Sequence, residues 1–304
     1  MINIISSCTN SKKVTASPLL QINSYDSNMS IDDVLNIWKI NTNSTQLSKY
    51  KPSDLYKGGS WKATIGTKKM LLTKFHTKLF IASAGYGLIE DTTEISAYDS
   101  TFASSTDSSI RKFIKNSSKQ DNIDWWNSIN TFELNTFSNN DYFFIILPYN
   151  YLYATQDTIK KIIEKFKMKV FIFRANKNTL PTFMSTNIIN IDSRFNHLKP
   201  GVQSDMLQRA VLWLSEEIIN KNIPLIHTDI QNHIDSTLEK YEKFSMPIRE
   251  KLSEEILYIK IKSLIQEDNI QSASKGLKAF REMGFACEQK RFGKIFKDIK
   301  GGLI

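Results

Sequence analysis

Residues 142–147 have the sequence YFFIIL, and residues 170–173 have the sequence VFIF. Runs that are apolar on both sides are typical of strands covered by helices on both faces of a sheet. Between them, residues 155–167 place Ile159, Ile162 and Phe166 at helical spacing. Parallel neighbouring strands need a crossover of about this length, so the segment predicts a βαβ unit.

Three more runs extend this pattern: residues 2–6, residues 78–83 and a weaker one at residues 187–191. A long amphipathic helix, buried on one side, is expected over residues 203–220. Strands that alternate with helical segments indicate an α/β fold, here a parallel sheet with helices on both faces.

The pattern changes near residue 226, because no strand run follows and charged helical segments dominate. Pro224 and Pro247 interrupt the chain there, and residues 249–267 carry an apolar helical stripe. We therefore predict an α/β domain over residues 1–225 and a helical domain over residues 226–304.

Composition excludes several classes of protein. The chain has 304 residues, 41% of them apolar, yet no window approaches the roughly 18 consecutive apolar residues of a membrane span. The N-terminus has no positively charged segment or cleavage site of a signal peptide, so we expect a cytoplasmic protein without a membrane partner. Two cysteines and four scattered histidines predict no disulfide framework, no metal site and no cofactor.

Positive charge is concentrated near the C-terminus. The net charge is +9, and residues 273–304 hold eight basic and three acidic side chains. Two helices are expected there, joined at residues 284–286, in an arrangement that resembles a helix-turn-helix. The basic residues lie on one side of the second helix. This side either binds DNA or is simply a solvated face. These residues are Lys290, Arg291, Lys294 and Lys297.

Polar side chains follow the first predicted strand, among them Cys8, Asn10 and Lys12. Open α/β sheets bind ligands beyond the carboxyl ends of their strands, so this loop either holds a phosphate or a base edge, or is simply solvated. Beyond the second strand, Tyr86 lies between two glycines and Asp99 lies in an uncharged stretch. Asp99 is a candidate base if partly buried, and otherwise a turn residue.

Two further features precede the buried helix. His197 either stabilises a developing anion or caps that helix from a surface loop. Residues 104–140 form a polar insertion that contains Trp125 and Trp126, which either anchor it to the core or stack on a base.

Three segments together resemble a bacterial and phage family related to the uracil-DNA glycosylase-like superfamily. They are residues 5–12 (ISSCTNSK), residues 55–61 (LYKGGSW) and residues 83–102, which run from SAGYGLI to YDSTF. Residues 277–292 also look like a shared ending. The family includes the glycosylase-like domain of archaeal tRNA-guanine transglycosylases and anti-phage glycosylases that remove hypermodified bases such as glucosylated hydroxymethylcytosine.

The resemblance implies roles for particular residues. Uracil-DNA glycosylases carry a water-activating acid in the first loop, where this chain has Asn10. The carboxylate would then come from Asp99, or failing that from Glu90 or Asp91. His197 or Lys199, in a loose match to the late His-Pro-Ser loop, would stabilise the leaving base. Tyr86 or Tyr98 would stack on the base. Asn10 with Lys12 would bind the edge of the base or a flanking phosphate.

The resemblance therefore implies a DNA glycosylase of anti-phage defence, which cleaves the N-glycosidic bond of a modified base flipped out of double-stranded DNA. It implies no obligate protein partner. Two alternatives remain open from the sequence: a base-exchange enzyme acting on tRNA or nucleosides, and a non-enzymatic DNA-binding protein that senses a nucleotide.

Overall fold

A computed structural model of the chain describes residues 1–9, 11–104, 106–175, 178–243 and 248–302. It divides into two compact units, Met1–Phe244 and Ser245–Ile304. The boundary therefore lies later than the predicted 225/226, and each unit is described separately. In the described residues, no helix is long and apolar enough to cross a membrane.

The first unit is built on a six-stranded sheet with the order β4-β3-β1-β6-β7-β8. All neighbours are parallel except β3 and β4, which form an antiparallel hairpin. The predicted α/β class is confirmed, but the sequence did not predict β4. The strands are β1 (Ile2–Ser7), β3 (Thr77–Ser83), β4 (Gly87–Glu90), β6 (Tyr142–Ile146), β7 (Val170–Arg174) and β8 (Ile188–Asn190).

The central strands are buried on both faces, as their apolar runs predict. Ile4 of β1 aligns with Leu79 of β3 on one side and with Phe144 of β6 on the other. Phe144 in turn aligns with Phe171 of β7. All four side chains are fully buried. Such a sheet is stable only when helices cover both of its faces.

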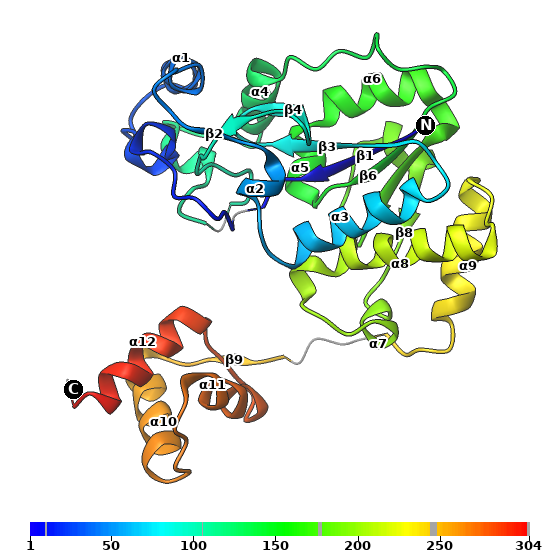
Figure 1. The fold of residues 1–304 in the computed structure, drawn as a ribbon. Helices are drawn as coiled ribbons and strands as arrows, with labels where there is room; N and C mark the ends of the chain where they lie inside the picture. Colours follow the sequence, from blue (N-terminus) through cyan, green and yellow to red (C-terminus); the bar gives the residue numbers. More distant parts are fainter. Residues whose placement is uncertain (10, 105, 176–177, 244–247, 303–304) are drawn as a thin grey trace. The chain divides into compact units, whose positions relative to one another are not determined.

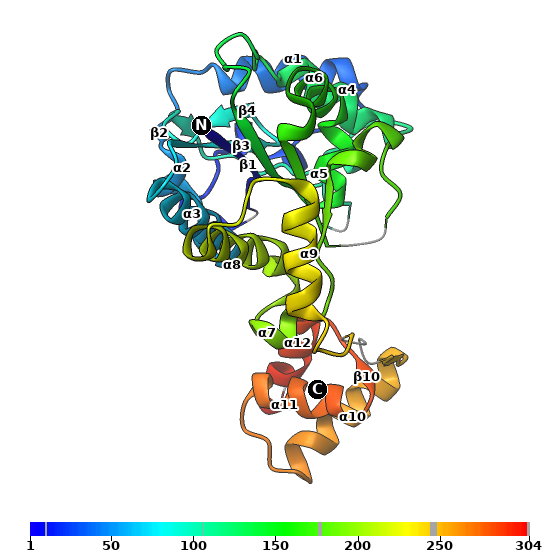
Figure 2. The ribbon, with the colours of Figure 1, turned by 90° about the vertical axis from the view of Figure 1, so that its right-hand side faces the viewer.

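Two layers of helices provide that cover (Figure 1). Helices α3 (Gly59–Leu72) and α8 (Met206–Lys221) pack together on one face. On the other face lie α4 (Gln120–Ile129), α5 (Tyr149–Ala154) and the predicted crossover helix α6 (Gln156–Phe166). Figure 2 shows the same separation from the side.

Helix α9 (His227–Leu238) explains the displaced boundary. The ring of His227 stacks on Phe171 with a centroid distance of 4.2 Å, and its Nε2 lies 2.9 Å from the Val170 carbonyl oxygen. Ile230 and Ile234 are fully buried in the same core as the sheet. The helix looks charged in the sequence, but one apolar stripe attaches it to the first unit.

The two tryptophans of the polar insertion lie inside the first unit. Trp125 and Trp126 are fully buried, and Trp125 Nε1 donates to the Ala84 carbonyl at 2.8 Å. The pair therefore anchors the polar insertion, and neither ring is available to stack on a base.

The other α-helices and strands of the first unit are short or peripheral. They are α1 (Ile31–Thr42), α2 (Pro52–Leu55), α7 (Phe195–Leu198) and a short antiparallel pair of β2 (Lys49–Tyr50) and β5 (Ile95–Ser96).

The second unit is a three-helix cluster with its own core, formed by α10 (Glu254–Gln266), α11 (Ala273–Glu282) and α12 (Gln289–Lys300). Between α11 and α12 the chain turns at Gly284, whose φ of 89° suits glycine, and β10 (Phe285–Ala286) pairs with β9 (Glu250–Lys251). The buried residues are Leu257, Ile261, Leu264, Leu277, Phe280, Phe292 and Phe296.

Candidate functional site

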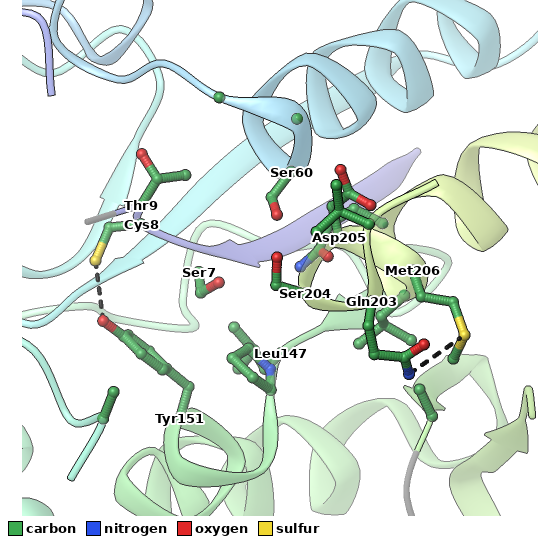
Figure 3. Close-up of a pocket in the computed structure, with 18 of the residues that line it drawn as sticks. Ser7, Cys8, Thr9, Ser60, Leu147, Tyr151, Gln203, Ser204, Asp205 and Met206 are labelled. Atoms are coloured by element: carbon green, nitrogen blue, oxygen red, sulfur yellow. Dashed lines mark hydrogen bonds between the residues drawn. The ribbon is translucent and has the colours of Figure 1, made fainter. Parts of the chain in front are cut away.

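The strand order places a ligand site between β1 and β6. From β1 the chain goes outward to β3 on one side, and it later returns to build β6, β7 and β8 on the other. Loops that leave neighbouring strands in opposite directions open a crevice at the carboxyl edge of the sheet. A cavity of about 620 Å³ lies at this edge (Figure 3), lined by Cys8 and Thr9 after β1, by Leu147 and Tyr149 after β6 and by Arg174 at the end of β7.

The N-terminus of α3 forms part of the cavity wall, and the carboxylate of Asp205, which directly precedes α8, lies against it. Gly58 has a φ of 106° and turns the chain into the helix, whose first residues Gly59 and Ser60 line the cavity. A Cβ atom at Gly59 would lie 2.2 Å from Asp205 Oδ2, so glycine is needed for this approach. The positive end of a helix favours a carboxylate there.

Arg209 holds Asp205 in place. Its Nε donates to Asp205 Oδ1 at 2.7 Å, and both side chains are largely buried, with exposures of 17% and 14%. The same guanidinium donates to Asn196 Oδ1 at 2.9 Å and to the carbonyls of Lys199 and Val202. Asp205 is thus a fixed carboxylate with an arginine that positions it.

A thiol and two hydroxyls form another side of the cavity. Cys8 Sγ lies 3.1 Å from the Tyr151 hydroxyl, and Thr101 Oγ1 lies 3.3 Å from it (Figure 3 draws the first contact). Burial raises the pKa of Tyr151 well above its ordinary value, with the neighbouring Cys8 acting in the same direction. Tyr151 therefore stays a neutral phenol that can donate and accept hydrogen bonds.

A second polar group, which we name the tyrosine cluster, consists of Lys12, Tyr56, Ser83, Tyr86 and Tyr98. The Tyr98 hydroxyl lies 3.0 Å from that of Tyr56 and accepts a hydrogen bond from Ser83 Oγ at 2.8 Å. Lys12 Nζ lies 4.3 Å from the centre of the Tyr98 ring. Tyr56, Ser83 and Tyr98 are completely buried, so the interior of the cluster is closed, whereas Lys12 and Tyr86 are partly exposed.

The ionisation of this cluster follows from its burial. Burial raises the pKa values of Tyr56 and Tyr98 well above the ordinary value, and that of Tyr86 to about 12. Burial lowers the pKa of Lys12, while the neighbouring Cys8 and Asp99 act to raise it. The predicted stacking of Tyr98 on a base is wrong, because its ring is enclosed. Tyr86 packs edge-on against it with a centroid distance of 5.4 Å.

The sequence placed the carboxylate at Asp99, which does not line the cavity. Its backbone bridges to an early loop: its N–H donates to the Leu20 carbonyl at 2.7 Å, and its carbonyl accepts from Ile22 at 3.0 Å. Asp99 is partly exposed beside the tyrosine cluster. Its backbone forms an isolated parallel β-bridge with Gln21, so it is not the turn residue that the sequence left as an alternative.

Other predicted residues also lie away from the cavity. Glu90, at the end of β4, pairs with Lys78 at 3.3 Å. The exposed His197 stacks on Tyr241 with a centroid distance of 6.2 Å. Lys199 meets the site through its carbonyl, which accepts from Arg209, rather than through its amine. Asn10 lies outside the described residues.

The sequence analysis missed the cavity residues Asp205, Arg174 and Gln208, and it singled out the segment that contains Gly59 without giving that residue a role. One signal was present: Asp205 and Arg209 are four residues apart where the long helix begins, which is the spacing of an ion pair. Gln208 and Arg174 carried no signal, because an amide in a helix and an arginine at a strand end are usually solvated.

The basic side of α12 is as predicted. Lys290, Lys294 and Lys297 are exposed, while Phe292 and Phe296 are buried in the core of the second unit. Arg291 is also exposed, but it pairs with Glu254 of α10. Glu288 is the N-cap of the helix, and its carboxylate accepts hydrogen bonds from the N–H groups of residues 290 and 291. Three lysines therefore present their ammonium groups on one exposed side.

Comparison with protein-family models, with curated proteins and with solved structures finds no match to this chain. Within the described ranges, no group of three or more His, Cys, Asp or Glu side chains is arranged to hold a metal ion. The arguments for function therefore rest on the cavity and the basic helix.

Proposed function

We propose that this chain is a DNA glycosylase that hydrolyses the N-glycosidic bond of a base flipped out of DNA. The observation that carries the proposal is a fixed carboxylate, Asp205, in the wall of a cavity at the topological switch point. A volume of about 620 Å³ falls in the range of small-molecule pockets, roughly 300–1,000 Å³. A base must leave the stack to reach such a site.

Asp205 supplies the first chemical requirement. Cleavage of the bond builds positive charge on the sugar, which a nearby carboxylate stabilises. The same carboxylate orients a water molecule and accepts its proton as the water oxygen bonds to the anomeric carbon. Arg209 and the N-terminus of α3 keep this group in position without occupying the cavity.

Arg174 and Tyr151 supply the second requirement. The leaving base takes the electron pair of the broken bond and becomes negatively charged unless donors meet it. Arg174 is cationic and lines the cavity, and Tyr151 is a neutral phenol in the same wall. Both can donate to the oxygen or ring nitrogen where that charge develops.

The exposed side of α12 serves to hold DNA. Lys290, Lys294 and Lys297 offer point charges for backbone phosphates, and such contacts are independent of sequence. In this proposal the second unit supplies affinity and the cavity supplies the reaction.

The test is to incubate the purified full chain with unmodified DNA, uracil-containing DNA and phage DNA that carries glucosylated hydroxymethylcytosine, and then to cleave abasic sites with alkali. We expect strand breaks on at least one modified substrate. Asp205→Asn protein from the same preparation is the control for contaminating glycosylases. Absence of breaks on all three substrates contradicts the proposal.

A further inference from the structure

Two residues that line the cavity each have a buried polar atom without a hydrogen-bond partner among the described residues: Gln208 Oε1 and Arg174 Nε. Gln208 is only 5% exposed. A buried carbonyl oxygen without a partner is costly, because burial removes the water that would otherwise satisfy it. Such groups in a cavity wall point to a ligand that provides the missing partners.

Their chemistry defines what that ligand must offer. The amide oxygen of Gln208 only accepts, so it needs a donor from the ligand, whereas the guanidinium of Arg174 only donates and needs an acceptor. Gln208 lies in the first turn of α8, next to the buried Leu207 and to Arg209, which pairs with Asp205. The helix fixes the position of its backbone, and burial restricts the movement of its side chain.

We propose that Gln208 and Arg174 determine base specificity by selecting a base with an exocyclic amino group. The proposal rests on the cavity being the base pocket described above. Gln208 Oε1 accepts from the amino group, and Arg174 donates to the acceptor beside it, which is N3 in cytosine and N1 in adenine. Guanine presents an N–H next to its amine on that edge, and an arginine cannot accept from it.

Matched nucleotides test this directly. Calorimetric titration of the full chain with dCMP against dUMP, and with dAMP against dIMP, compares ligands in which an oxo group replaces the amine. We expect the amino member of at least one pair to bind roughly tenfold more tightly, the usual discrimination of a good base contact. Equal affinity within both pairs, or no binding of any of the four at millimolar concentration, overturns the proposal.

Two leucine variants separate recognition from structure. Gln208→Leu is expected to lose the preference for the amino member while its melting temperature stays the same or rises, because an apolar side chain replaces an unpaired buried amide. Gln266→Leu is the matched control, because Gln266 is an exposed helical glutamine of α10 that does not line the cavity. It is expected to keep the preference.

The outcomes also separate this proposal from glycosylase activity. Retention of the preference by Gln208→Leu shows that Gln208 does not read the base and overturns the inference. A preference lost in Gln208→Leu, together with no abasic sites on any DNA, supports base recognition by Gln208 and refutes hydrolysis alone.

Discussion

The cavity and the tyrosine cluster both lie near the carboxyl edge of the sheet, and they differ in one respect that decides their roles. In the tyrosine cluster the hydroxyls of Tyr56, Ser83 and Tyr98 satisfy one another and Tyr98 has no exposed surface, although the Tyr86 hydroxyl has no partner among the described residues. In the cavity, Gln208 Oε1 and Arg174 Nε lack partners among the described residues, and Asp205 lines open space. A satisfied polar network stabilises a fold, whereas unsatisfied groups beside a cavity are available to a ligand.

This difference matters because the more conspicuous sequence belongs to the closed region. Residues 83–102 contain the glycines, tyrosines and carboxylates that look most like an active site. In the structure most of them form the β3–β4 hairpin and one wall of the core, and Thr101 lines the cavity. The cavity instead takes its carboxylate from the start of α8, a segment without any recognisable motif.

A large effect on base release is expected from Gly59→Ala. A Cβ atom there would meet Asp205 Oδ2 at 2.2 Å, and because that atom ends a side chain, Asp205 moves rather than the backbone. Base release should fall by about 100-fold, since small displacements of a catalytic group cost about this much. Rates of abasic-site formation measure the effect.

Gly293→Ala is the control for this change, because a Cβ atom at that helical position meets nothing within 4 Å. It should leave base release unchanged. A Gly59→Ala enzyme with full activity would show that the position of Asp205 is unimportant and would remove the proposed distinction between the two regions.

Tyr98→Phe tests the structural role of the tyrosine cluster. The change leaves the buried hydroxyls of Ser83 and Tyr56 without their shared partner, which should lower the free energy of unfolding by about 2 kcal/mol. Urea denaturation measures it, with Tyr25→Phe as the control, because Tyr25 is partly exposed. Loss of base release with unchanged stability would instead place Tyr98 in the reaction.

A charge reversal on α12 tests whether DNA affinity is separate from the cavity. Lys290→Glu combined with Lys294→Glu should weaken DNA binding about tenfold near 0.1 M salt and reduce the salt slope by about 2, if each lysine meets one phosphate. The rate of base release at saturating DNA should not change. The charge-matched control is Lys251→Glu with Lys262→Glu, two exposed lysines of the same unit outside α12. Equal losses in both double variants would contradict a specific role for α12.

The smallest effect is seen only in alkali. Burial raises the pKa values of Tyr56 and Tyr98 in the folded protein, so the unfolded chain ionises first. The stability that these two neutral tyrosines contribute is complete below about pH 10, the ordinary tyrosine pKa. It is lost as the pH rises toward their pKa values in the folded protein. Each tyrosine adds about 1.4 kcal/mol per pH unit to the decline. In urea denaturation between pH 9.5 and 11, Tyr98→Phe should show a shallower decline, and an equal decline would contradict the closed state of the cluster.

Much of the fold could be predicted from the sequence, because strands buried on both faces leave uninterrupted apolar runs such as residues 142–147. The hairpin strand β4 was missed, since a strand of four residues that begins at Gly87 carries little pattern. The boundary was placed too early because α9 attaches through only one stripe and the stacked ring of His227.

The site was predicted only in part. Strand ends are visible in a sequence, so Cys8, which follows β1 and lines the cavity, was among the candidate residues. The approach of Asp205 to Gly59 depends on how α3 and α8 pack, and no local pattern encodes that contact. The unpaired state of Gln208 is likewise a property of the assembled core.

The most direct test compares Asp205→Asn with Asp99→Asn, two equally conservative changes, on the DNA that the wild-type protein cleaves best. The cavity account predicts that Asp205→Asn lowers the rate of base release by about 1,000-fold, within the usual range for a general base, while Asp99→Asn stays within about twofold of wild type. The reverse result, an inactive Asp99→Asn and an active Asp205→Asn, would contradict the cavity account. It would indicate that the reaction takes place at the loop of residues 98–102.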